Sequence, residues 1–199
     1  YIEEYGVTQV TMNITNITET PLHLAFDETA KAANARGIRA TGSELVGLVP
    51  KSAILEAGKY FLRKQNRSTG IHESELIKIA IKSMGLDELG PFIPQERIIE
   101  YMLESGTDKK LVDLSLTDFA NETASESPAP GGGSISAYAG ALGISLATMV
   151  ANLSAHKRGW DERWEEFSDW ADKGQILKDE LLFLVDEDTN SFNKIMEAM

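Results

Sequence analysis

The sequence predicts an α+β fold, in which a two-layer subdomain of helices on a sheet is followed by an all-α segment of a helical bundle. Apolar residues alternate with polar residues at Val10, Met12 and Ile14, as they do in a half-buried strand. Strand-like and helix-like stretches then follow each other through the first half of the chain, which is typical of helices packed on a sheet. From Leu111 onward the periods are helical and the alternation is gone.

The first predicted elements are a strand, a helix and a second strand. The alternation extends over residues 7–17, and a second strand is expected over residues 38–46. Between the strands, Thr20 is expected to cap a helix that has Pro21 at its first position and Gly37 at its end.

Three further helices complete the first predicted domain, which we place at residues 1–104. Pro50 is expected to open one helix, and residues 73–84 form the next, with Gly85 as its terminating residue. Pro94 introduces a last short helix, with which the domain ends.

A linker and a second domain follow. Residues 105–110 contain no apolar side chain, and we assign residues 105–112 to the linker. Residues 113–199 have the pattern of the first part of a helical domain, in which Ser115 and Asp118 form a capping pair for the first helix.

Composition excludes several functional classes. The formal net charge of −12 argues against a nucleic-acid partner, because such binding needs clustered positive charge. The sequence has no cysteine, and His72 and His156 have no partner at metal-ligand spacing, so neither disulfides nor a metal site are expected. No signal-peptide pattern precedes the first strand, so we expect a cytoplasmic protein, and a first residue other than Met suggests a piece of a longer chain.

The stretch from Ser127 to Leu153 is the most informative part of the chain. Gly131, Gly132 and Gly133 can adopt backbone angles closed to other residues, and Ser134 can cap a helix that begins there. Free N–H groups at such a helix start attract anions or carbonyl oxygens, so these four residues are candidates for ligand contact. The alternative is a flexible linker, which the immediate start of a helix disfavours.

The helix after the glycines carries small side chains at every fourth residue, namely Gly133, Ala137, Ala141 and Ser145. Such a strip lets another backbone approach closely. The run is uncharged and long enough to raise the question of a membrane span. Glycine, serine and alanine dilute its apolar content, so we expect a helix inside a bundle and no membrane span.

Two sets of motifs resemble known families. PAPGGGS (residues 128–134), followed by a small-residue helix ending in MVANL, resembles the start of the formiminotetrahydrofolate cyclodeaminase and methenyltetrahydrofolate cyclohydrolase family. TPLHLAFDETAKAANARGI (20–38), GSELVGLVP (42–50) and MGLDELGPFIPQERIIEYML (84–103) resemble the C-terminal subdomain of glutamate formiminotransferase. Their order is similar to that in the bifunctional formiminotransferase-cyclodeaminase family of histidine breakdown.

The resemblance implies a folate-dependent one-carbon enzyme. It implies transfer of a formimino group from formiminoglutamate to tetrahydrofolate, then cyclisation to methenyltetrahydrofolate with release of ammonia. A polyglutamylated tetrahydrofolate would be substrate and one-carbon carrier, without a metal, in a homo-oligomer. The transferase histidine of the family would precede Tyr1, so the chain alone is expected to lack transferase activity. The alternatives are a cyclohydrolase-like enzyme and a non-catalytic helical oligomerisation module.

Asp188 is the candidate catalytic residue. It falls on the apolar stripe of Val185 and Phe192, whereas Asp186 points away from that stripe. Burial raises the pKa of a carboxyl group, which suits a general base. A position at the boundary of the buried face and a buried ion pair are the alternatives, and the resemblance of LVDEDTNSF (184–192) to the cyclodeaminase segment with the catalytic aspartate favours the catalytic role.

Three further residues are candidates for folate contact. Ser43 and Glu44 lie where the second predicted strand leaves the sheet, a common place for ligand-binding turns, although a structural turn explains them equally well. Lys157 follows the small-residue helix and could meet a folate carboxylate, although positive charge favours a helix C-terminus in any case. His23, in the TPLH motif, is expected at the surface or as a cap.

Overall fold

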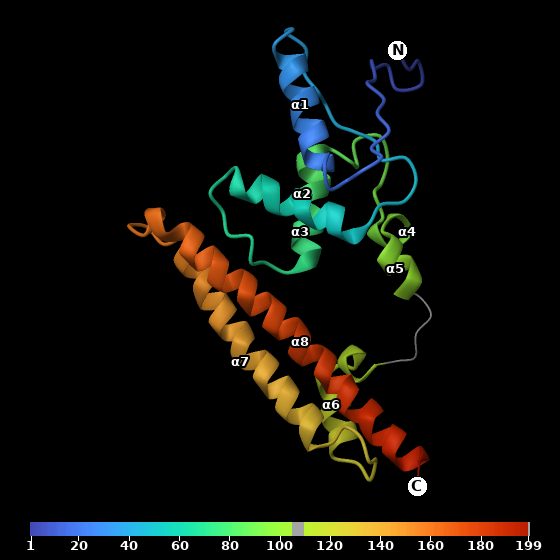
Figure 1. The fold of residues 1–199 in the computed structure, drawn as a ribbon, viewed down its shortest axis with the longest axis vertical. Coiled ribbons are helices and arrows are strands. Elements are labelled where there is room, and N and C mark those ends of the chain that lie inside the picture. The colour runs from blue at the N-terminus through green and yellow to red at the C-terminus, as the bar shows by residue number, and fades with distance from the viewer. Residues whose placement is uncertain (105–109, 199) are drawn as a thin grey trace. The chain divides into compact units, whose positions relative to one another are not determined.

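The computed structural model describes residues 1–104 and 110–198, and the chain divides into two compact units, Tyr1–Gly106 and Thr107–Met199 (Figure 1). Residues 105–109 of the predicted linker lie outside the described part. The helices of the first unit are α1 (Leu22–Asn34), α2 (Lys51–Arg63), α3 (Glu73–Met84), α4 (Pro94–Arg97) and α5 (Ile99–Glu104). The second unit contains η1 (Leu111–Asp113), α6 (Leu116–Thr123), α7 (Gly132–Ala155), η2 (Asp161–Arg163) and α8 (Trp164–Glu197).

The predicted sheet is wrong, and with it the α+β assignment of the first unit. Over the described residues, β-pairing is limited to two isolated bridges, Ile2 with Val7 and Val49 with Ile98. The segments expected as strands are extended loops, in which Val10 is 66% exposed and Val46 is 84% exposed. Alternation indicates an extended backbone, but a strand also needs a neighbour for its backbone hydrogen bonds. Apart from the bridge of Val7 to Ile2, neither segment pairs with a strand among the described residues, so the regular secondary structure of the unit is helical.

The observed helix boundaries agree with the predicted ones more often where a proline or glycine marks the end of the helix than where another residue was expected to cap it. Thr20 does not cap α1; Pro21 is the N-cap residue, and the helix ends three residues before Gly37. Pro50 directly precedes α2, as predicted. Helix α3 has its predicted bounds, and Gly85 ends it in the left-handed conformation with φ of 58°.

The core of the first unit forms where α2 packs on α3. Gly58 on α2 makes this close approach possible, since an added Cβ would lie 2.3 Å from the carbonyl oxygen of Leu76. Ile54 and Met84 are almost completely buried there. The buried cluster consists of Val49, Ala53, Ile54, Ala57, Phe61, Ile77, Ala80, Ile81, Met84, Leu86 and Ile98.

The last predicted helix of the first unit is divided at Ile98. The Val49 N–H donates to the Arg97 carbonyl at 2.9 Å, and the Ile99 N–H donates to the Val49 carbonyl at 3.1 Å. This bridge holds Ile98 in an extended conformation between α4 and α5 and buries its side chain. Around this buried residue, the bridge to Val49 thus replaces helical hydrogen bonds.

The second unit is built on an antiparallel pair of long helices, α7 and α8 (Figure 1). Small side chains are buried between them, among them Ala141, Thr148 and Ala171. Gly174 lies against Thr148, where an added Cβ would be 2.0 Å from the threonine Oγ1, and α8 continues through this glycine without interruption. Small residues bring the two helices close together. Of the predicted strip only Ala141 is buried, and the buried positions Ser134, Ala141, Thr148 and Ala155 recur every seven residues instead of every four. Ser115 caps α6 and accepts a hydrogen bond from the Asp118 N–H, also as predicted.

Helix α7 leaves most of its surface uncovered by the described residues. An 18-residue window within it has a mean hydropathy of 1.5, enough by length and composition for a membrane span, and 22% of that window is buried. Its exposed side carries large apolar residues, Leu142, Leu146, Met149, Val150 and Leu153. An uncharged helix of this kind needs a further apolar environment.

Candidate functional site

The glycine motif of residues 131–133 forms the start of α7. Gly131 is extended and provides no side-chain cap, and Gly132 is the first helical residue. Ser134 lies within the first turn with 0% exposure, so the prediction that it caps the helix is wrong. The reason is that α8 supplies a cap instead: the Ser134 N–H donates to Asp188 Oδ2 at 2.9 Å.

The Ser134 hydroxyl connects the start of α7 to the same turn of α8. Its Oγ lies 2.7 Å from the Val185 carbonyl oxygen, 3.1 Å from Asp188 Oδ2 and 3.4 Å from Thr189 Oγ1. A serine hydroxyl has one proton to donate, and Val185 offers the nearest acceptor. The backbone N–H of Ser134 is therefore the donor to the Asp188 carboxylate. The Ser134 hydroxyl holds α7 to α8 next to that carboxylate through its bond to Val185.

Gly133 provides the space for the Asp188 side chain. An added Cβ at Gly133 would lie 2.2 Å from Asp188 Oδ1 and 2.5 Å from its Cγ, whereas an added Cβ at Gly132 would meet nothing within 4 Å. Gly131 is less crowded, with Asp188 Oδ2 at 3.6 Å from the corresponding position. The close approach that the sequence indicated is thus concentrated at Gly133, and the group that approaches is a carboxylate of the same chain.

Asp188 and Asp186 both differ from their predicted environments. Asp188 faces α7, but the residue as a whole is exposed, so the predicted burial is wrong for the described chain. Asp186 was expected on the outward face of its helix, away from the apolar stripe; there its Oδ1 accepts a hydrogen bond of 2.6 Å from the Leu111 N–H. The reason is that η1 packs on α8 at that side, which the helical stripe alone could not indicate.

The arrangement gives a carboxylate that is held at one oxygen and open at the other. Over the described residues, no hydrogen-bond donor reaches Asp188 Oδ1, and the nearby N-terminus of α7 is the positive end of the helix dipole. An exposed carboxylate next to unpaired helix N–H groups can accept a proton from a bound ligand while those N–H groups bind an oxygen or anion.

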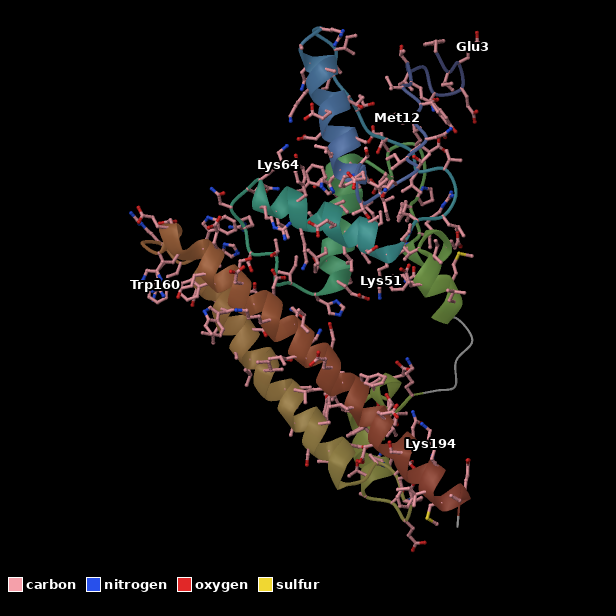
Figure 2. All side chains as sticks on the ribbon, in the orientation of Figure 1. Glu3, Met12, Lys51, Lys64, Trp160 and Lys194 are labelled. Carbon is pink, nitrogen blue, oxygen red and sulfur yellow. The ribbon has the colours of Figure 1, made fainter. Side chains whose placement is uncertain are left out.

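Lys157 is far from this carboxylate within the second unit. It follows the C-terminal end of α7, and the 24 residues of that helix correspond to about 36 Å. Its ammonium lies 4.3 Å from the ring centroid of Trp160, which lies at the turn between the two long helices (Figure 2). Trp160 also stacks on Phe167 at 5.3 Å. Lys157 and Asp188 therefore do not form one compact site.

Ser43 and Glu44 belong to a turn of the first unit. The Ser43 hydroxyl donates to the Met84 carbonyl at 2.8 Å, and its N–H donates to the Gly85 carbonyl at 3.1 Å. These bonds attach the loop to the C-terminal end of α3. The Ser43 hydroxyl thus has a structural partner, while the Glu44 side chain is exposed.

A polar cluster between α1 and α2 was missed by the sequence reasoning. Asp27 is 8% exposed and accepts hydrogen bonds from Tyr60 Oη at 2.6 Å and from Lys64 Nζ at 2.8 Å. The hydrogen bond from Lys64 holds the pKa of Asp27 below its usual value, and the bond to Asp27 raises the pKa of Tyr60. Lys64 lies at the end of α2 (Figure 2). Spacings of four residues on both helices were the signal that could have indicated this cluster.

His23 belongs to the same cluster and is not at the surface. It is 7% exposed and stacks on Tyr60 with 4.3 Å between ring centroids. Burial lowers its pKa, and within the described part of the chain its buried Nδ1 has no hydrogen-bond partner. The expected surface or capping role of this histidine is therefore wrong. No group of three or more potential metal ligands occurs among the described residues.

Comparison with protein families gives two matches in series. The sequence model of the family described as "Formiminotransferase domain" matches residues 1–104, and that of the family described as "Formiminotransferase-cyclodeaminase" matches residues 115–199. The second match includes the whole glycine motif, α7 and Asp188.

Curated relatives share this order. A "Formimidoyltransferase-cyclodeaminase" of Gallus gallus is 38% identical over an alignment of 200 positions that covers 100% of this chain and 37% of that protein. Its counterpart of the same name in Mus musculus is 36% identical, again over 100% of this chain and 37% of that protein. A "Methenyltetrahydrofolate cyclohydrolase" of Methylorubrum extorquens is 31% identical over 84 residues, 42% of this chain and 40% of that protein. The chain thus spans 37% of the length of the first two relatives.

Proposed function

This chain belongs to the formiminotransferase-cyclodeaminase family, and from that premise we propose that the complete protein is a folate-dependent one-carbon enzyme of histidine degradation. It transfers the formimino group of formiminoglutamate to N5 of tetrahydrofolate and then cyclises the product to methenyltetrahydrofolate, with release of ammonia. The observation that carries the proposal is the succession of the two family matches, residues 1–104 and 115–199, on one chain.

Asp188 is the proposed proton shuttle of the cyclisation. N10 of the folate attacks the carbon of the formimino group, whose nitrogen is protonated, and the N10 proton passes to the carboxylate as the new carbon–nitrogen bond forms. The same proton then passes to the former imino nitrogen, which leaves as ammonia while the methenyl cation remains. Support comes from the exposed position of Asp188 beside the first turn of α7, where the carboxylate can meet a ligand.

The start of α7 is the proposed folate contact. The N–H groups of its first turn can bind a carbonyl oxygen of the pteridine or an amide of the ligand. Gly131 and Gly132 provide an open approach, while Gly133 and Ser134 hold Asp188. Ser43 and Glu44 are proposed contacts of the transferase half, and Lys157 is a proposed contact for the charged polyglutamate tail, because α7 separates it from the reacting centre.

Association with further copies of the protein is part of the proposal. The uncovered face of α7 with Leu146 and Leu153, each more than 60% exposed, supports a large apolar interface, and so do Phe183 and Ile195 on α8. We propose a homo-oligomer without a membrane span, in the cytoplasm, without a metal. A monomeric complete protein in sedimentation velocity would contradict the oligomer.

The function is tested by supplying the complete protein with tetrahydrofolate and formiminoglutamate. Methenyltetrahydrofolate is followed by its absorbance and ammonia by a coupled assay, and both are expected to appear in equal amounts. Hydrolysis of added methenyltetrahydrofolate without any ammonia from formiminoglutamate would indicate a cyclohydrolase instead, a reading that the Methylorubrum extorquens match favours. The absence of both reactions and of folate binding would leave the oligomerisation module. Without the remainder of the protein, this chain should show no transferase turnover.

A further inference from the structure

We propose that Gly133 and Ser134 form a seat for Asp188, and that they act in the cyclisation by positioning this carboxylate rather than by binding folate. The inference rests on the proposed function of Asp188. It assigns a different part to two residues that the sequence alone marked as ligand contacts.

Ser134 is in no position to touch a ligand. Its exposure is 0%, and its N–H and hydroxyl are both within hydrogen-bond distance of α8. The N–H binds Asp188 Oδ2 at 2.9 Å, while the hydroxyl binds the Val185 carbonyl one turn earlier at 2.7 Å. Together these bonds fix both the separation and the register of the two helices at the carboxylate.

Gly133 sets the other limit of the seat. Because an added Cβ would lie within 2.7 Å of Oδ1, Oδ2 and Cγ of Asp188, the carboxylate occupies the space that a side chain at this position would fill. Any larger residue must push the carboxylate away from α7 and thus break its bond to the Ser134 N–H. The requirement for glycine at this position therefore comes from the aspartate of α8.

The seat distinguishes the two oxygens of Asp188. Oδ2 is occupied by the Ser134 N–H, whereas no donor from residues 1–104 or 110–198 reaches Oδ1. The geometry points to Oδ1 as the atom that takes the N10 proton and returns it to the departing nitrogen. Oδ2 remains bound through both transfers, so the carboxylate does not need to rotate.

The test compares four variants of the complete enzyme with wild type. Gly133→Ala displaces the Asp188 carboxylate. Misplacement of a group that takes part in the reaction costs about 10²-fold in kcat. Ser134→Ala removes the bond to Val185 and should lower the cyclodeaminase kcat by about tenfold, the effect of one modest interaction. The KM for the folate should change by less than about threefold in both, since neither residue binds it. Transferase turnover should be unchanged.

The matched controls lie on the same helix. Gly143→Ala introduces the same methyl group where no atom of the described residues lies within 4 Å, and Ser136→Ala removes a hydroxyl that donates to the Gly132 carbonyl within α7. Both should retain wild-type cyclodeaminase kcat. Melting temperatures of all four variants separate loss of folding from loss of turnover, and Ser134→Ala, which adds no atoms, remains informative if Gly133→Ala does not fold.

A second arm repeats Ser134→Ala in an Asp188→Asn background. If Ser134 acts through the carboxylate, its substitution should have no further effect on kcat there. Full additivity of the two effects, or a rise in KM with kcat unchanged, would overturn the positioning role while leaving the proposed function intact. Wild-type turnover by Asp188→Asn alone would instead remove Asp188 as the base, and the seat with it.

Discussion

The two units of the chain differ in the size of the side chains that are buried between their helices. In the first unit, large apolar side chains such as Ile54, Phe61 and Met84 are buried between α2 and α3. In the second unit, the buried positions between α7 and α8 are mostly small, and large apolar residues such as Leu153 and Phe183 are exposed. The first unit has a core of its own, while the second has a tight helical pair that still offers an apolar surface.

This difference indicates what each unit requires. Burial of large side chains supplies most of the stabilisation of a domain, so the α2–α3 core is the main source of stability within the first unit. Two helices that bury small residues gain less from each other, although they position backbone groups accurately. The second unit therefore combines a well-defined carboxylate seat with an exposed apolar face on α7.

The largest effect on this comparison is expected from Gly58→Ala in the complete protein. The added Cβ meets the Leu76 backbone at 2.3 Å, and backbone cannot move aside as a side chain can. We expect a loss of about 3 kcal/mol in the free energy of unfolding of the first unit. Hydrogen exchange of the α2 and α3 amides measures it, with the amides of α7 and α8 in the second unit as the internal control. Unchanged exchange would contradict the close packing of these helices.

A smaller effect is expected from Gly174→Ala, the corresponding change in the second unit. Here the obstacle is Thr148 Oγ1, a side-chain atom, so the helices can adjust at a cost of about 1–2 kcal/mol. Hydrogen exchange of the α7 and α8 amides measures the loss. Adding Thr148→Ala should recover most of it, since the two positions are coupled. Failure of the double variant to recover would mean that another contact controls the approach of α7 to α8.

The smallest effect concerns His23 and the pH dependence of the first unit. Burial lowers its pKa from 6.5, so below that pH the unfolded chain binds more protons than the folded one. Stability from this group is therefore present above pH 6.5 and is lost as the pH falls towards the folded-state pKa. His23→Phe keeps the stacking on Tyr60, removes the unpaired Nδ1, and should flatten this decline by less than about 1 kcal/mol. An equally steep decline in the variant would contradict its assignment to His23.

The sequence predicted helices well where their ends are marked by residues with distinct backbone preferences. Pro50 and Gly85 located the limits of α2 and α3, and Ser115 located the start of α6. It failed at residues 7–17 and 38–46, because alternation describes one strand and carries no information on a pairing partner. It also failed at Ile98, where a tertiary bridge to Val49 breaks a helical pattern.

At the candidate site, the sequence predicted the identity of the residues better than it predicted the contacts between them. The glycine motif and Asp188 were both identified, and the structure places them together. That Asp188 caps α7 in place of Ser134 follows from the register between two helices, which no local pattern contains. Lys157 was grouped with them because it is close along the sequence to the same helix, although the length of α7 separates it from Asp188.

The most direct measurement compares Asp188→Asn with Asp186→Asn in the complete enzyme under identical conditions. Asp186 binds the Leu111 N–H, and asparagine retains an acceptor oxygen for that bond, so its cyclodeaminase turnover should remain close to wild type. Asp188→Asn removes the proton acceptor and should lower that turnover by about 10²–10⁴-fold, with folate binding and transferase activity preserved. If Asp186→Asn proved the sensitive variant and Asp188→Asn remained active, the carboxylate beside Gly133 would have no part in the chemistry.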